Sequence, residues 1–76
     1  MRLQVGDIIR VDGFVMLAKL DEGRYRVKSI SKYHGQDTYT FSKPRGKKSI
    51  CRFYVHQIDP FLRTADCSDL NKIVKE

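Results

Sequence analysis

The cations of the central segment are the residues of this chain best suited to binding chemistry. Between Arg24 and Arg52 there are nine Lys and Arg residues and one acid, Asp37, which give this segment a net charge of +8. The whole chain carries +6, so the other 47 residues carry −2. A basic centre between slightly acidic ends is typical of proteins that bind a polyanion. The same charge would also keep a small protein apart from its neighbours.

The spacing of these cations suits phosphate groups. Arg24, Arg26 and Lys28 occupy alternate positions, which places them on one side of a strand at intervals of about 6–7 Å, close to the phosphate spacing of a nucleic-acid strand. A second group would form a narrow cationic tip: Lys43, Arg45, Lys47 and Lys48. The strand and the tip act together only if the fold brings them onto one face. The alternative is that these cations protect an edge strand against aggregation.

Tyrosines are interleaved with the charges. Tyr33 and Tyr54 lie in or near the polar phase of their segments and are candidates for stacking on nucleic-acid bases. Tyr25 and Tyr39 share the phase of neighbouring apolar residues, which favours a place in the core.

Other site chemistries find little support. Metal-binding side chains are few and widely separated, whereas structural zinc ligands come in pairs two to four residues apart. The candidates are Cys51, Cys67, His34 and His56. No Gly-rich phosphate loop and no nucleophile setting is present. We therefore expect no metal, no cofactor and no catalytic residue, and we read Cys51 as a buried thiol.

A central hairpin must position the tip. Residues 38–42 and 49–55 are β-branched and aromatic with alternating polarity, and residues 43–48 contain the turn formers Pro44 and Gly46. Tyr39, Phe41, Phe53 and Val55 should face the core.

Upstream, residues 5–11 predict a turn and a strand, and Asp12-Gly13 predicts a two-residue hairpin. The apolar run 14–20 is compatible with strand, helix or loop. After a turn at 21–23, residues 24–28 alternate as a strand. The pattern slips at Ser29-Ile30, where a β-bulge would return Ile30 to the core. Residues 34–37 predict another turn.

Downstream, Pro60 ends the preceding strand and predicts a tight turn before one last short strand. In the tail, Leu70, Ile73 and Val74 have helical spacing, with Ser68 or Asp66 as N-cap. We predict a short helix within residues 64–76.

Three motifs carry a resemblance to a known fold: V-G-D-I-I-R-V at 5–11, G-R-Y-R-V at 23–27 and I-D-P at 58–60. Over about residues 3–62 the chain resembles an SH3-like barrel of the kind found in KOW-type nucleic-acid-associated domains. Where the KOW pattern has a further glycine, this chain has M-L-A-K at 16–19. The resemblance implies an interaction module without catalysis.

We therefore predict one mainly β domain over residues 1–76, a five-stranded SH3-like barrel with a short C-terminal helix. With no signal peptide or membrane helix in the sequence, we expect a cytoplasmic monomer or weak dimer.

The predicted function is a small basic module, with a regulatory role, that contacts the phosphates of DNA or RNA with weak sequence preference. The predicted contacts are Arg24, Arg26, Lys28, Lys32, Tyr33, Lys43, Arg45, Lys47, Lys48, Arg52 and Tyr54. The alternative is a protein-binding adaptor or inhibitor that docks its basic face on an acidic partner protein. Small size and positive charge are compatible with a phage-derived regulator of this kind.

Overall fold

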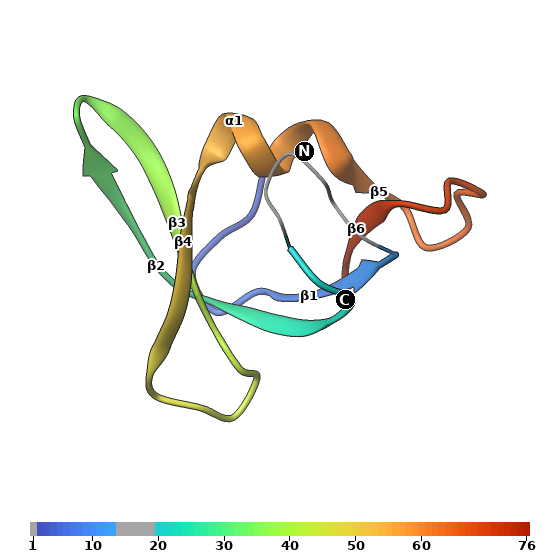
Figure 1. The fold of residues 1–76 in the computed structure, drawn as a ribbon, viewed down its shortest axis with the longest axis horizontal. Helices are drawn as coiled ribbons and strands as arrows, with labels where there is room; N and C mark the ends of the chain where they lie inside the picture. The colour runs from blue at the N-terminus through green and yellow to red at the C-terminus, as the bar shows by residue number, and fades with distance from the viewer. Residues whose placement is uncertain (1, 14–19) are drawn as a thin grey trace.

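The structure is a computed structural model that describes residues 2–13 and 20–76. These residues form six strands of one sheet (Figure 1). The strands are β1 (Ile8–Asp12), β2 (Gly23–Tyr33), β3 (Gln36–Ser42), β4 (Ser49–Tyr54), β5 (Leu62–Arg63) and β6 (Lys72–Lys75). One helical turn, α1 (Val55–Ile58), and a 3-10 turn, η2 (Asp59–Phe61), connect β4 to β5. The mainly β prediction is confirmed, but the sheet has six strands rather than five.

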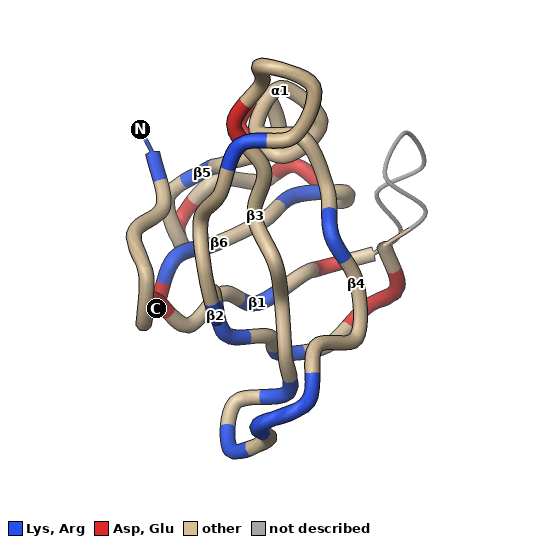
Figure 2. Tube along the Cα trace, turned by 90° about the vertical axis from the view of Figure 1, so that its left-hand side faces the viewer, with Lys and Arg blue, Asp and Glu red and all other residues tan. Residues whose placement is uncertain are grey.

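The strand order is β4-β3-β2-β1-β6-β5, and all neighbours are antiparallel except β5 and β6. Figure 2 shows β2, β3 and β4 as one layer, with β1, β5 and β6 behind it. The long strand β2 belongs to both layers because it pairs with β1 through its first half and with β3 through its second. The two end strands, β4 and β5, are not neighbours, so the sheet is not closed.

The bend in β2 confirms the predicted bulge. Its pairing with β3 shifts register between Val27 and Ser29, which leaves Lys28 as the extra residue. Val27 is fully buried before the bulge, and Ile30 packs against the core after it. A short turn then joins β2 to β3, with positive φ at His34 (51°) and Gly35 (76°), as a two-residue hairpin requires.

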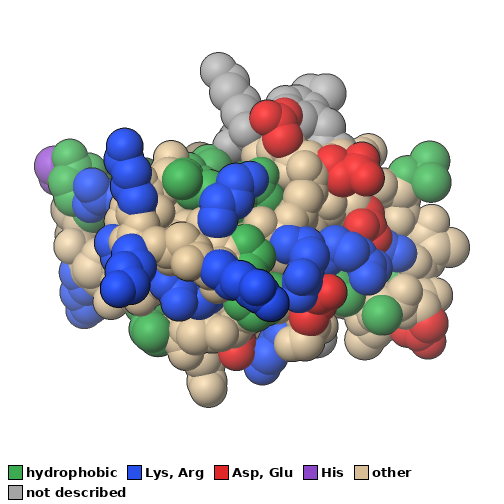
Figure 3. Space-filling model, turned by 90° about the horizontal axis from the view of Figure 1, so that it is seen from below, with side chains coloured by type: hydrophobic (Ala, Val, Ile, Leu, Met, Phe, Trp, Pro, Cys, Tyr) green, Lys and Arg blue, Asp and Glu red, His purple; other side chains and the backbone are tan. Residues whose placement is uncertain are grey.

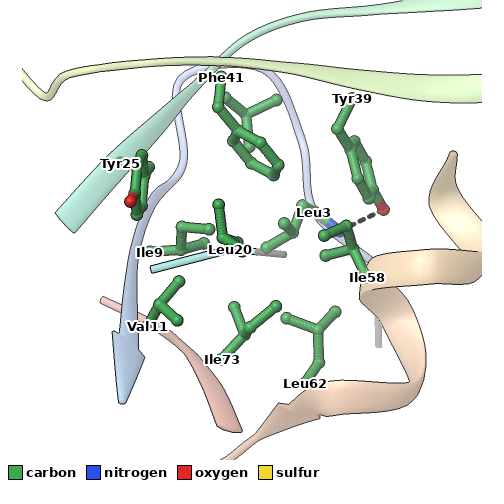
Figure 4. Close-up of a cluster of buried hydrophobic side chains, with 11 residues drawn as sticks. Leu3, Ile9, Val11, Leu20, Tyr25, Tyr39, Phe41, Ile58, Leu62 and Ile73 are labelled. Atoms are coloured by element: carbon green, nitrogen blue, oxygen red, sulfur yellow. Dashed lines mark hydrogen bonds between the residues drawn. The ribbon is translucent and has the colours of Figure 1, made fainter. Parts of the chain in front are cut away.

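The central hairpin is confirmed as β3 and β4, and its aromatic residues line the core. Tyr39 and Phe41 are fully buried, and Phe53 is partly buried against them. Figure 4 shows the rings pointing from β3 toward Leu3 and Ile58. Each large apolar side chain buried in this way contributes about 1.5–3 kcal/mol. The opposite side of the same layer therefore faces away from the core.

The helix predicted within residues 64–76 is wrong. Residues Lys72–Lys75 form β6, which pairs with β1 from Asp12↔Lys72 to Ile9↔Lys75. Ile73 and Val74 are both buried, whereas Leu70 is 85% exposed. A short isolated helix is marginal in water, but a strand here hydrogen-bonds the second edge of β1 and covers the core. The tertiary partner therefore overrides the local spacing.

The two-residue hairpin predicted at Asp12-Gly13 is also wrong. Val11 pairs with Gly23 on β2 and with Ile73 on β6, so distant residues occupy both of its edges. Of the ambiguous run 14–20, residues 14–19 lie outside the described part of the chain, and Leu20 is buried in the core.

The helical turn of the structure lies earlier than the predicted helix. It begins at Val55, directly after β4, where the Tyr54 backbone N–H donates to Gln57 Oε1 (2.9 Å). Then η2 begins at Asp59, directly before Pro60, and β5 follows, which confirms the predicted turn and short strand, although β5 is not the last strand because β6 comes after it. In residues 2–13 and 20–76 no helix has the length and apolar character needed to cross a membrane.

Candidate nucleic-acid interface

The outer face, by which we mean the side of β2, β3 and β4 away from the core, carries a row of hydroxyl groups. Because Tyr39 and Phe41 point inward, the neighbouring Thr38 and Thr40 lie on the opposite side of β3, where Thr40 is partly exposed and Thr38 is buried. Cross-strand partners share a face. The partners here are Ser29 and Ser31 on β2, and Arg52 and Tyr54 on β4. The outer face is therefore polar along its centre.

Two tyrosines enclose a small hollow at one end of the outer face, which we call the tyrosine pocket. The ring centroids of Tyr33 and Tyr54 are 6.5 Å apart with an angle of 41° between the planes. The Arg52 guanidinium carbon lies 5.1 Å from the Tyr33 centroid, in cation–π geometry. The pocket has a volume of about 210 Å³ and is also lined by Thr38 and Gln57.

Neighbouring groups brace both tyrosine rings. His34 meets the Tyr33 ring edge-on at 4.2 Å between centroids, and His56 stacks on the Tyr54 ring at 5.4 Å. The Thr38 hydroxyl donates to the Ser31 carbonyl at 3.0 Å, and this bond holds the Thr38 side chain at the wall of the pocket. The rings are thus held in place while Tyr33 remains 47% exposed.

A second hollow continues from the tyrosine pocket toward the β3–β4 connection, and Arg52 lines both. We call it the hydroxyl groove. Its volume is about 420 Å³, and it is lined by Ser29, Thr40, Ser49, Ile50, Cys51 and Arg52. Lys28 reaches this groove from the bulge, because its Nζ donates to Ser49 Oγ at 3.0 Å.

The cationic tip, residues 43–48, is held against β2. Arg26 Nη2 donates to the Gly46 carbonyl at 2.9 Å, and the Gly46 N–H donates to the Lys43 carbonyl at 3.0 Å. Arg26 Nε is buried and has no hydrogen-bond partner in the described part of the chain, so the Nη2 bond is what ties this side chain to the tip. Of the three strand cations, Arg26 and Lys28 therefore lie beside the tip.

Lys and Arg gather at this end of the molecule. Figure 2 shows them concentrated in the β3–β4 connection at the bottom of the view. Seen from that end, they form a band across the surface, and most Asp and Glu lie toward the right of the view (Figure 3). Arg45, Lys47 and Lys48 are exposed and make no ion pair or hydrogen bond with another described side chain.

The ion pairs of the structure lie elsewhere. Within the described ranges they join Arg2–Asp37, Arg10–Asp12, Arg24–Glu76, Arg63–Asp69 and Lys75–Asp7 at 2.5–3.5 Å. Of the basic residues between Arg24 and Arg52, only Arg24 has a carboxylate partner in this part of the chain. The protein's own acids therefore leave the outer face and the tip positively charged.

Three predicted contacts are not part of this arrangement. Arg24 is paired with Glu76, with 2.8 Å between Nε and Oε2. Lys32 follows the bulge in the phase of Ile30 and lies opposite Asp37, on the inward side of the hairpin end. Lys43 belongs to the tip and is exposed, but its Nζ lies 5.2 Å from the Tyr25 ring, in cation–π geometry. The bulge decides the placement of Lys32, whereas Arg24 meets Glu76, the residue that follows β6.

Two groups of lining residues were missed by the sequence analysis. The first is the hydroxyl row of Ser29, Thr38, Thr40 and Ser49, and the second is Gln57. The alternation of threonines with Tyr39 and Phe41 could have revealed Thr38 and Thr40 as an outward row. Nothing in the local pattern indicates Gln57, which reaches the pocket because α1 turns back beside Tyr54.

Cys51 lines the hydroxyl groove but is a poor nucleophile. Burial raises the pKa of its thiol, and Lys43 lowers it by a smaller amount, so the thiolate is disfavoured. Among the described residues no three His, Cys, Asp or Glu side chains lie close enough together to hold a metal ion.

The outer face thus combines stacking rings, hydroxyl groups and unpaired cations in one connected surface. Such a surface can bind the phosphates of a polyanion and stack planar groups. No protein-family model, curated protein or solved structure matches this chain.

Proposed function

We propose that the protein is a small nucleic-acid-binding module, with a regulatory role, that uses its outer face and cationic tip. The observation that carries this proposal is the lack of carboxylate partners for the cations between Arg26 and Arg52 in the described structure, while five of the acids pair with cations outside this range. Unpaired cations on one surface release counterions when they meet phosphates, which is the main source of non-specific affinity.

The proposed contacts follow the geometry of the outer face. The phosphate-binding residues are Lys28, Arg45, Lys47, Lys48 and Arg52. Arg26 positions the tip through the Gly46 carbonyl. Hydroxyl groups of the groove add hydrogen bonds to phosphate or sugar oxygens. Because such contacts carry no direct sequence information, we expect weak sequence preference.

Salt dependence tests the proposal. If each of the five cations engages one phosphate, log K against log salt on duplex DNA should have a slope of about −4 to −5. In the double variant Lys47→Gln/Lys48→Gln the slope should become shallower by about 2, since each lost contact removes about 0.9. Fluorescence anisotropy with a labelled random-sequence oligonucleotide measures both.

The matched control removes two positive charges from a part of the surface away from the tip. Arg63 and Lys75 lie in ion pairs away from the tip, with Asp69 and Asp7. The variant Arg63→Gln/Lys75→Gln has the same net charge as the tip variant and should keep the wild-type slope. Binding that does not change with salt, or an equal loss in both variants, would refute the proposal.

The finer assignment of the fold, an SH3-like barrel resembling KOW-type domains, is part of the proposal. Three features support it: β1 to β4 follow one another as antiparallel neighbours, a 3-10 turn at Pro60 precedes β5, and the chain returns to β1 through β6. An interaction module is the function that such a fold favours by analogy.

A second candidate is an adaptor or inhibitor that binds an acidic protein. It is favoured by β4, an end strand of the sheet on which Ile50 is 46% exposed, because an open edge accepts an added strand. This candidate would replace the first if no nucleic acid binds at low salt and an acidic protein binds with a dependence on Ile50→Lys.

A further inference from the structure

We infer that the tyrosine pocket holds an unpaired base, so that the ligand class is single-stranded nucleic acid. This inference rests on the function proposed above and specifies its ligand. It assigns two tasks to one surface: the cationic tip binds phosphates, and the pocket selects strands whose bases are free.

The size of the pocket fits one ring system. Its volume of about 210 Å³ is below the roughly 300–1,000 Å³ of sites for small-molecule ligands. Aromatic side chains line it on two sides, and Tyr33 is 47% exposed although it is large and apolar on its faces. An exposed aromatic face beside a hollow is a stacking surface, and every base has a π-face that can use it.

Arg52 adds a second stacking plane with a charge. Its guanidinium lies over the Tyr33 ring and makes no hydrogen bond or ion pair with another described residue. A guanidinium plane stacks on bases and keeps its donors for a phosphate or a base edge. Arg52 also lines the hydroxyl groove, so it connects the pocket with the path to the tip.

The distance from the tyrosine pocket to the cationic tip suits a short segment of single-stranded nucleic acid. From Thr38 to Ser42 the β3 backbone extends over about 13 Å, with Thr40 on the groove between them. Lys28 lies at Ser49 on the far side of the groove. A base in the pocket would therefore leave its neighbouring phosphates over hydroxyl groups and cations. In a duplex the bases are stacked inside the helix and cannot enter the pocket.

The test compares three ligands of equal length: a single strand of about 10 thymidylates, an abasic strand and a duplex. Stacking is worth about 1–3 kcal/mol per base, so the base-bearing strand should bind about 5- to 150-fold more tightly than the abasic strand. Tyr33→Leu or Tyr54→Leu should reduce that difference, because either variant weakens binding of the base-bearing strand more than binding of the abasic strand. Tyr33→Phe and Tyr54→Phe keep the rings and should keep the difference.

Arg52→Lys provides an independent variant. It keeps the charge and loses the plane, so the slope of log K against log salt should stay as in wild type while the preference for base-bearing strands falls. Tyr33 lies on an exposed hairpin end, so Tyr33→Leu remains informative even if Tyr54→Leu disturbs α1.

The possible failures are distinguishable. If the Leu variants weaken base-bearing and abasic strands equally, or if the duplex binds best, the base pocket is refuted and phosphate binding stands. If no nucleic acid binds while an uncharged proline-rich peptide binds at Tyr33 and Tyr54, both the pocket ligand and the proposed function are wrong.

Discussion

Tyr39 is the residue at which three distant parts of the chain meet. It lies on β3, its hydroxyl donates to Asp59 Oδ1 in η2 at 2.9 Å, and it accepts the backbone N–H of Leu3 at 3.2 Å (Figure 4). Burial and the hydrogen bond to Asp59 raise the pKa of Tyr39 to about 12, so the hydroxyl stays protonated and able to donate.

Tyr39→Phe should therefore destabilise the protein by about 1–3 kcal/mol, because it leaves a buried N–H and a carboxylate without their partner. Urea unfolding at unchanged m-value measures this change. The control is Tyr33→Phe, which removes an exposed hydroxyl and should change the unfolding free energy by no more than about 0.5 kcal/mol. Equal effects of the two substitutions would contradict the role given to the Tyr39 hydroxyl.

At the scale of elements, the join between β1 and the segment before β6 depends on a close backbone approach. Gly13 has φ of 73°, and a Cβ at this position would lie 2.5 Å from the Leu70 carbonyl oxygen and closer still to the Asn71 side chain. Gly35 has nearly the same φ, 76°, but an added Cβ there would meet open space.

The two glycines form a matched pair for substitution. Gly35→Ala should cost about 1–2 kcal/mol, the strain of a left-handed alanine. Gly13→Ala carries the same strain and also pushes the 70–71 backbone away, so it should cost at least about 1 kcal/mol more. Thermal or urea unfolding of both variants checks the difference. If the two are equally stable, the approach seen at Gly13 is not required for docking of β6.

In β2, the local sequence pattern predicted both the alternation of side chains and the bulge. The alternation of Tyr25 and Val27 with cations was predictable because side chains on a strand alternate with period two. The bulge was visible in the misplaced Ile30, and it reverses the phase of everything after it. That reversal places Lys32 on the inward side and Tyr33 on the outer face, so the nine basic residues of the segment do not all lie on one face.

At the scale of the whole molecule, ion pairs make the stability of the fold depend on pH. Asp12 and Asp37 are paired with Arg10 and Arg2, and these hydrogen bonds hold the pKa values of both carboxyl groups below the ordinary value of 3.8. A carboxyl group with a lowered folded-state pKa stabilises the protein above its unfolded-state pKa. That contribution is lost as the pH falls through the folded-state pKa.

Stability should therefore decline as the pH is lowered below about 4, and Asp37→Asn should reduce the decline because it removes one of the linked protons. Melting temperature measured from pH 6 to pH 2 tests this. Raising the ionic strength should weaken the effect, since both pairs are solvent-accessible. The idea fails if wild type and Asp37→Asn lose stability in parallel over the whole range.

The sequence by itself determined the features that depend on neighbours in the chain. These are the central β3–β4 hairpin, the inward aromatic rows, the bulge and the cationic turn. Each is encoded by side-chain period or turn chemistry within about ten residues. The net positive charge and its concentration in the middle of the chain also follow from the sequence alone.

The tertiary structure decided the rest. Residues 72–75 are a strand because β1, more than 60 residues earlier, offers an open edge: Ile9 pairs with Lys75. The cationic tip joins the β2 cations because Arg26 reaches the carbonyl of Gly46, and α1 brings Gln57 to the tyrosine pocket. These pairings are non-local, and their free energy comes from partners that no local pattern contains.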